Sequence, residues 1–276
     1  MKKSYSITRT PLTPFRKLII DGLDVGMKKH YIKGYVEFDI TKSRQSIRTY
    51  RRQSKNRLSF TAFFIAGVVQ ALQENKSLNA GLYKNNIVVF DDIDVSLAIE
   101  MSLNGEMVPR LFVIRSAHKM TVQEIQNEIE AAQKQIREQG DLQGGEKNKA
   151  AMLVLKLPKC IRKMVWNRLL RDPFFTRRMM GTVGITAVGM FGALSGWAEP
   201  IPTSNHTVSF ALGSVTRKPR EIKGAIIMRD ILHVTIMFDH DVVDGAPAAR
   251  FAERLRELVE NGLDGFKKQN APGTGT

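Results

Sequence analysis

One apolar run near the end of the chain constrains the fold more than any other segment. Residues 231–238 are rich in β-branched and large apolar side chains, which is typical of a buried strand, and the residues after Gly245 have the spacing of an amphipathic helix. Between them stand His240 and Asp244, so the sequence predicts a strand-to-helix corner that carries a histidine. Such a corner holds a side chain between two rigid elements and can present it to a ligand.

Three interpretations of His240 follow from the residues alone. A histidine in a polar loop is usually only solvated, so the first is a histidine without a chemical role. A metal site is the second, because Asp239, Asp241 and Asp244 flank His240, although no second histidine and no cysteine cluster lie nearby. The third is a general base, since histidine titrates nearest to neutral pH. In that case Asp244 would orient the corner and Gly245 would supply a tight backbone conformation.

The remaining elements mix strands and helices without a regular repeat. Alternating or continuous apolar residues predict strands over 31–40, 87–90, 93–101, 108–115, 182–188, 207–215 and 225–238. Helical spacing predicts helices over 41–55, 59–74, 121–138 and 245–261, whereas residues 1–30 are interpreted as irregular. Because the late strands follow one another directly, the order favours an α/β fold, a two-layer mixed-sheet sandwich, over a doubly wound nucleotide fold.

The charge of the chain is unusual. Lys and Arg number 42 against 27 Asp and Glu, which leaves +15 and a pI near 10.0. This excess favours an anionic partner, which can be nucleic acid, a membrane surface or a phosphate-rich cofactor. Nucleic acid is not expected, because no nucleic-acid-binding motif accompanies the charge. A single cysteine, Cys160, excludes an intrachain disulfide and a cysteine-based metal cluster, and with no secretory signal visible we expect a cytoplasmic protein.

Residues 141–180 differ in character from the rest. A polar linker containing Gly144 and Gly145 leads to Pro158, which we expect in the first turn of a basic helix. The apolar stripe of that helix consists of Ile161, Val165, Trp166, Leu169 and Leu170. Its cationic face consists of Lys159, Arg162, Lys163, Arg168 and Arg171. The pattern fits an interfacial membrane helix, or a helix packed on the core with solvated cations. Residues 158–178 are thus a candidate contact with an anionic membrane, which would make the protein membrane-peripheral.

Four ordered segments carry a resemblance to a known family. With the His240-x-x-x-Asp244-Gly245 pattern between strand and helix, the chain resembles the catalytic domain of the dihydrolipoyl acyltransferase component of 2-oxo acid dehydrogenase complexes. It is more distantly similar to chloramphenicol acetyltransferase. Residues 181–192 are similar to the family's Gly-Thr-Phe-Thr-Ile-Ser-Asn-Leu-Gly-Met-Phe-Gly segment, and residues 104–109 to its Asn-Gly-Leu-Val-Val-Pro segment. Residues 60–63 with 78–80 are similar to its buried helix and the residues that follow, and residues 15–17 to its Ile-Arg-Lys segment. The resemblance covers about residues 15–262 apart from 141–180.

The resemblance implies a CoA-dependent acyltransferase with a chloramphenicol acetyltransferase-like fold. His240 would deprotonate a thiol, hydroxyl or amine acceptor, which then attacks the thioester of acyl-CoA without an acyl-enzyme. Thr186 stands where the family has its oxyanion-stabilising serine. Asp244 would be structural, in a buried pair with Arg16. Acyl-CoA is then the co-substrate, and no metal is implied.

Three departures from the family pattern shape the remaining expectations. No lipoyl domain precedes the catalytic region, so we expect no covalently attached lipoyl group. Asp241 stands where the family usually has arginine, which reverses the local charge. A polar tail replaces the family's apolar anchor, so we expect an isolated homotrimer with its active sites at subunit interfaces. A trimeric scaffold or binding module without catalysis is the alternative. The expected organisation is an N-terminal extension over 1–14, a catalytic domain over 15–265 with the 141–180 insert, and a disordered tail over 266–276.

Overall fold

The computed structural model describes residues 7–103, 106–139, 153–154, 156–187, 195–201 and 206–262. Its centre is a six-stranded sheet in the order β1-β8-β7-β6-β4-β5. The strands are β1 (Tyr31–Asp39), β4 (Val95–Leu103), β5 (Glu106–Ile114), β6 (Val183–Ala187), β7 (Val208–Ile222) and β8 (Ala225–Asp239). β6 runs parallel to β4 and to β7, and the other neighbours are antiparallel. The sheet is therefore mixed, as the sequence predicted. A separate hairpin joins β2 (Ala80–Tyr83) to β3 (Asn86–Val89).

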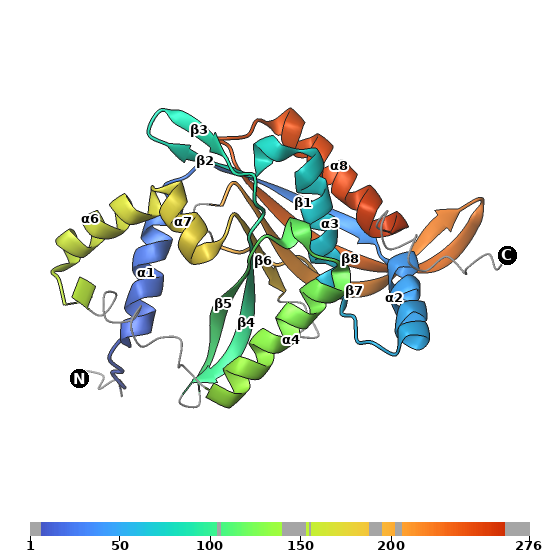
Figure 1. The fold of residues 1–276 in the computed structure, drawn as a ribbon, viewed down its shortest axis with the longest axis horizontal. Helices are drawn as coiled ribbons and strands as arrows, with labels where there is room; N and C mark the ends of the chain where they lie inside the picture. Colours follow the sequence, from blue (N-terminus) through green and yellow to red (C-terminus); the bar gives the residue numbers. More distant parts are fainter. Residues whose placement is uncertain are drawn as a thin grey trace, which may run out of the picture.

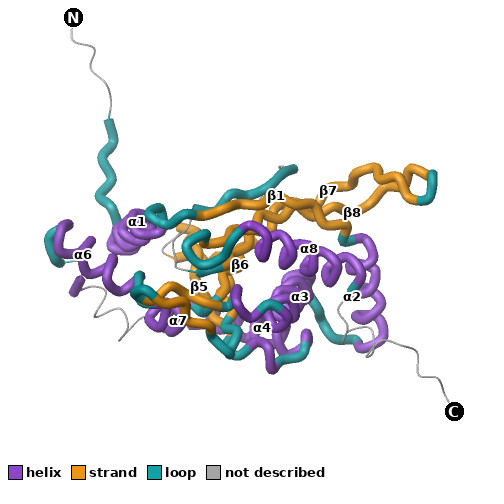
Figure 2. Tube along the Cα trace, turned by 90° about the horizontal axis from the view of Figure 1, so that it is seen from above, coloured by secondary structure: helices purple, strands orange, loops and turns teal. Residues whose placement is uncertain are grey.

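Four helices cover one face of this sheet. They are α2 (Thr41–Ser54), α3 (Phe60–Glu74), α4 (Val122–Gln139) and α8 (Gly245–Asn261), which Figure 2 shows together on one side. Figure 1 shows three further helices at one end of the sheet, namely α1 (Pro14–Gly26), α6 (Lys159–Leu170) and α7 (Pro173–Met180). Two short 3-10 helices, η1 (Lys76–Leu78) and η2 (Ala117–Lys119), complete the described elements. The two-layer α/β architecture expected from the sequence is confirmed.

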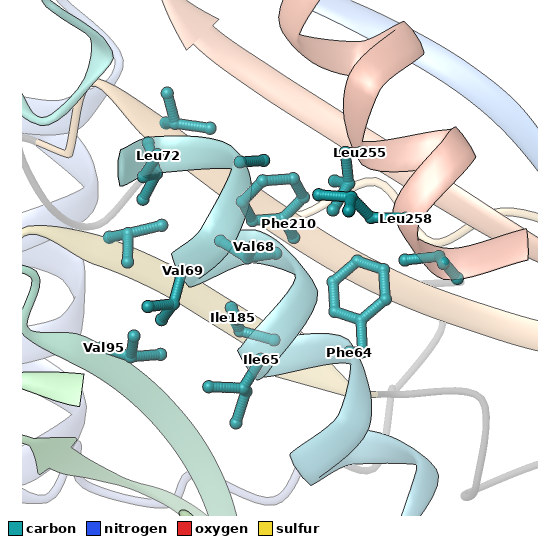
Figure 3. Close-up of a cluster of buried hydrophobic side chains, with 14 of the residues drawn as sticks. Phe64, Ile65, Val68, Val69, Leu72, Val95, Ile185, Phe210, Leu255 and Leu258 are labelled. Carbon is teal, nitrogen blue, oxygen red and sulfur yellow. The ribbon is translucent and has the colours of Figure 1, made fainter. Parts of the chain in front are cut away.

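The core lies between α3, α8 and the sheet. The helix α3 begins where the Ser59 side chain accepts a hydrogen bond from the Ala62 amide, and most of its later residues are buried. Figure 3 shows its side chains facing Ile185 and Phe210 of the sheet and Leu255 of α8. Burying each large apolar side chain contributes roughly 1.5–3 kcal/mol. This core fixes the strand ends from which the candidate site is built.

A long two-stranded arm extends beyond the sheet. Sequence alternation predicted a strand only to residue 215, but β7 continues to Ile222 and pairs with β8 down to Ala225. Figure 1 shows this arm projecting past α2. Near its tip Ile226 is 79% exposed. At the base of the arm, the Ile40 amide donates to the Asp230 carbonyl at 2.9 Å, which ties the start of α2 to β8.

The prediction of an irregular segment over 1–30 was wrong for residues 14–26, which form α1. The Thr13 hydroxyl accepts a hydrogen bond from the Arg16 amide, and Pro14 occupies the first helical turn. A threonine cap followed by proline is a helix-start signal. The strand β2 was also not predicted. Pro158 stands at the N-cap of α6, one residue before the first turn expected for it. The disordered tail predicted over 266–276 lies outside the described residues.

The insert helix α6 packs on α1. Arg162 forms a bidentate ion pair with Asp21, and both side chains are largely buried. Lys163 pairs with Asp24 and holds the pKa of that carboxyl below its usual range. Leu170 is buried, and the residues before it on the apolar stripe are half-buried except for Ile161. The expectation of a solvated cationic face is therefore wrong for Arg162, which is buried against Asp21, whereas Lys163 stays exposed in its pair with Asp24. Within the described ranges, no helix has the length and apolarity to span a bilayer.

Candidate functional site

The predicted corner forms at the junction of β8 and α8. The His240 amide donates to the His30 carbonyl at 2.7 Å, and the Asp239 amide donates to the Thr207 carbonyl at 2.9 Å. The amide of Val243 in turn donates to the Asp239 carbonyl at 3.0 Å. These bonds fix the backbone on both sides of His240. Its side chain is 44% exposed, so the imidazole extends from a fixed backbone and is accessible to a ligand.

The three carboxylates around His240 point to different partners. Asp239 is fully buried and pairs with Lys29. Asp241 Oδ1 lies 2.8 Å from His30 Nδ1, and this contact raises the pKa of the His30 imidazole. Asp244 Oδ1 lies 3.9 Å from His240 Nδ1, with 88% of its side chain exposed. The metal interpretation would require these carboxylates to converge, and instead two of the three are engaged by cations.

Sequence reasoning missed His30 and Lys29. Both precede β1, whose first residue Tyr31 pairs with Asp239 in the antiparallel ladder. No local motif marks them, because they reach the corner only through pairing of strands about 200 residues apart. Burial next to Asp239 also raises the pKa of the Tyr31 phenol, so the tyrosine stays neutral at physiological pH.

The structure does not pair Arg16 with Asp244. Arg16 stands in the first turn of α1 and is exposed. The C-terminal end of α1 is the end that connects to His30 and the corner. Ten residues of helix separate the two ends, which is about 15 Å. The ion pair found for Asp244 among the described residues is with His240. The buried Arg16–Asp244 pair expected from the resemblance is therefore replaced by an exposed contact within the corner itself.

The backbone role predicted for Gly245 is also wrong. Gly245 begins α8 with a φ outside the left-handed region, and a Cβ placed on it would contact nothing within 4 Å. Its conformation is thus open to other residues. Asp244 occupies the N-cap position but makes no side-chain capping bond. Its carboxylate is therefore available to the His240 imidazole.

The structure places Thr186 far from His240 of the same chain. Thr186 pairs with Ala211 on β7, which pairs with Thr235 on β8. Thr235 and His240 are five residues apart along the strand, and two strand spacings separate Thr186 from Thr235. Together these give roughly 20 Å between Thr186 and His240. Thr186 also follows the core residue Ile185, so its hydroxyl points to the sheet face opposite the helices.

A basic groove lies at the other end of β8. Its volume is about 500 Å³, and it is lined by Thr41, Arg44, Arg48, Val215, Thr216, Arg217, Met228 and Asp230. Arg44 pairs with Asp230 at 2.9 Å. Arg48 and Arg217 have no acidic partner among the described residues, and the Thr216 hydroxyl is buried without a hydrogen-bond partner there. The groove therefore offers two uncompensated guanidinium groups. Sequence reasoning missed this groove, although the absence of acidic residues from 41–54 is a signal that could have pointed to it.

Comparison with known families gives one match over most of the chain. Residues 5–147 and 177–264 match the model of the 2-oxoacid dehydrogenases acyltransferase (catalytic domain). The unmatched residues between these ranges contain α6, so the packed helix on α1 is outside the family pattern.

Curated proteins and solved structures agree with this match. The succinyltransferase component of the 2-oxoglutarate dehydrogenase complex of Haemophilus influenzae is 24% identical over 260 residues, which cover 92% of this chain and 54% of that protein. The acetyltransferase component of the pyruvate dehydrogenase complex of Mycoplasma genitalium is 28% identical over 224 residues, covering 80% of this chain and 48% of that protein. The chain thus spans about half the length of these relatives. A probable dihydrolipoamide acetyltransferase from Listeria monocytogenes has the same fold, with a TM-score of 0.71, 22% identity, and coverage of 96% of this chain and 98% of that one.

Proposed function

Because the chain belongs to the 2-oxoacid dehydrogenase acyltransferase family, as its catalytic domain, we propose that it moves an acyl group from acyl-CoA directly to a thiol, hydroxyl or amine acceptor. His240 is the general base in this proposal. The observation that carries it is the exposed imidazole at a rigid corner, with the Asp244 carboxylate 3.9 Å from Nδ1. Asp244 then favours a proton on Nδ1 and leaves Nε2 to accept one from the acceptor.

The proton and bond changes balance without another reactant. Nε2 of His240 takes the acceptor proton as the acceptor attacks the thioester carbonyl. The carbon–sulfur bond then breaks, the acyl group stays on the acceptor, and the CoA sulfur receives the proton from His240. General-base assistance of this kind is typically worth about 10²–10⁴-fold in rate.

We propose further that the complete site needs two copies of the chain. The oxyanion formed in the attack requires a donor within hydrogen-bond distance, and Thr186 of the same chain is roughly 20 Å from His240 by strand register. Thr186 on the exposed side of the sheet of one copy would meet His240 of the next. A homotrimer would have three such interfaces, each with one complete site. Light scattering should give three times the chain mass, and a stable, fully active monomer would exclude this arrangement.

The basic groove is the proposed place for the phosphate groups of CoA. Arg48 and Arg217 supply uncompensated charge, and the Thr216 hydroxyl supplies a buried donor. The groove is about 30 Å along β8 from His240 of the same chain, so it too would serve the site of another copy. Arg48→Gln should raise KM for acyl-CoA several-fold with kcat unchanged. Arg57→Gln, at an 89% exposed arginine outside the groove, is the matched control. Equal KM values for the two variants would exclude the groove.

His240→Ala tests the central proposal. Release of CoA thiol is followed with a panel of acyl-CoAs, offering dihydrolipoamide, amines and alcohols in turn. The variant should lose at least 10²-fold in kcat with the acceptor that the wild type uses. Circular dichroism and urea unfolding will test whether the variant folds, which is expected because the His240 side chain is 44% exposed. Full activity of His240→Ala would refute the general-base mechanism.

A further inference from the structure

The ion pair between His30 and Asp241 has no role in the mechanism above. We propose that His30 is a positioning residue, which acts through Asp241 to keep that carboxylate away from the imidazole of His240. The proposal rests on the proposed function of His240 as the base.

Two contacts join His30 to the corner. Its carbonyl accepts the His240 amide hydrogen bond at 2.7 Å, and its Nδ1 lies 2.8 Å from Asp241 Oδ1. The first contact fixes the backbone of His240, and the second fixes the side chain of the residue that follows. Both depend on the pairing of Tyr31 with Asp239, which brings the end of β8 beside the start of β1. His30 is thus placed by the sheet and not by a flexible loop alone.

The charges around the corner determine what the loss of the His30–Asp241 ion pair would do to His240. Three carboxylates lie within residues 239–244, and each has a separate partner. Asp239 is buried against Lys29, Asp241 is one-third exposed against His30, and Asp244 faces His240. If the imidazole of His30 is removed, Asp241 loses its cation and has His240 as its sequence neighbour. Its carboxylate would then compete with Asp244 for the imidazole and turn the ring from its working orientation.

The pair is sensitive to pH through His30. The hydrogen bond and the charge of Asp241 raise the pKa of the imidazole, Asp239 adds to this, and the neighbouring Lys29 is engaged by Asp239. Above that pKa His30 becomes neutral and its hold on Asp241 weakens. His30 is 80% exposed, so the proton exchanges freely with solvent. Lysine in the same place would keep its charge to about pH 10.

The experiment compares His30→Ala, His30→Lys, Asp241→Asn and the double variant His30→Ala with Asp241→Asn. His30→Ala should lower kcat roughly two- to tenfold, the range of one ordinary protein hydrogen bond, with KM for acyl-CoA unchanged. Asp241→Asn should be close to wild type, and the double variant should recover most of the lost kcat, because the competing carboxylate is gone. His30→Lys should sustain kcat to higher pH than the wild type does.

Two results would overturn the positioning role. Either His30→Ala keeps the wild-type kcat and pH profile, or the double variant remains as slow as His30→Ala, which would make the loss a matter of general stability. His240→Ala, measured alongside, separates this from the function itself. If His240→Ala is inactive while the His30 variants are unaffected, only the positioning role falls. If His240→Ala is fully active, both proposals fall.

Discussion

His206 should make the fold sensitive to acid at the junction of β6 and β7. Its Nε2 lies 2.9 Å from the Met180 carbonyl at the end of α7, and its Nδ1 lies so close to Gly184 that a Cβ there would be at 2.7 Å. Burial lowers the pKa of His206 from an ordinary value of 6.5 to about 4. The imidazole is therefore neutral in the folded protein down to that pH.

The difference between the His206 pKa in the folded and unfolded chain sets the sign and size of the change in stability with pH. Between pH 6.5 and pH 4 the unfolded chain binds a proton on His206 and the folded chain does not, so stability falls as the pH is lowered through this window. About 2.5 pH units at about 1.4 kcal/mol per unit give about 3 kcal/mol in total. The contribution is complete near pH 4, and below that the folded form is protonated as well.

The assay is urea unfolding of the wild type and of His206→Gln at one protein concentration, at pH 7.5 and at pH 4.5. Carboxylates such as Glu37, whose pKa is lowered by Lys218, also cost stability in acid, but they titrate equally in both proteins. The wild type should therefore lose about 2–3 kcal/mol more than the variant between the two pH values. An equal loss in both would show that His206 is protonated in the folded protein well above pH 4.

Three further substitutions test the packing of the insert and of the core. Arg162→Leu should cost about 3–5 kcal/mol in the free energy of unfolding, because it leaves the Asp21 carboxylate buried and unpaired, whereas Lys163→Leu, at an exposed pair, should have little effect. Chemical denaturation of both variants measures the difference, and equal costs would mean that Asp21 finds water. Phe64→Ala removes a fully buried ring next to Phe210 and should cost about 3–5 kcal/mol in the same assay; a cost under about 1 kcal/mol would indicate that the core closes over the space.

Local pattern was sufficient for elements that bury one regular face. The apolar spacing over 59–74 and 245–261 predicts α3 and α8 almost to the residue, since both press a continuous stripe onto the sheet. The second half of β7 lacks such a face. Residues 216–222 stand in an arm where side chains are exposed or only half-buried, and most of them are polar, so the hydrophobic alternation that identifies a strand is absent. The helix α1 was obscured by Pro11 and Pro14, although Thr13 followed by Pro14 is a start signal for a helix.

The candidate site was predictable only in its local half. His240, Asp241 and Asp244 follow from one continuous segment that turns from strand to helix. Their partners do not, because Lys29 and His30 arrive through a ladder between β1 and β8. The pairing of Arg16 with Asp244 failed for the same reason, since it assumed a long-range contact that no local rule sets. Register also decided the position of Thr186, which a motif match alone cannot convert into a distance.

The distribution of charge moves the proposed anionic contact from the insert to the groove. Two of the five cations on the predicted face of residues 159–171 are paired with acids of α1. By contrast, α2 contains no acid, and Figure 1 shows it beside the arm, at the other end of the molecule from α1 and α6. There Arg48 and Arg217 line a hollow of about 500 Å³. A hollow lined by two arginines without acidic partners among the described residues suits a compact phosphate group, whereas a flat anionic surface would need an exposed cationic face such as the one that α1 partly neutralises. Under the proposed function, part of the +15 charge would serve the phosphate groups of acyl-CoA.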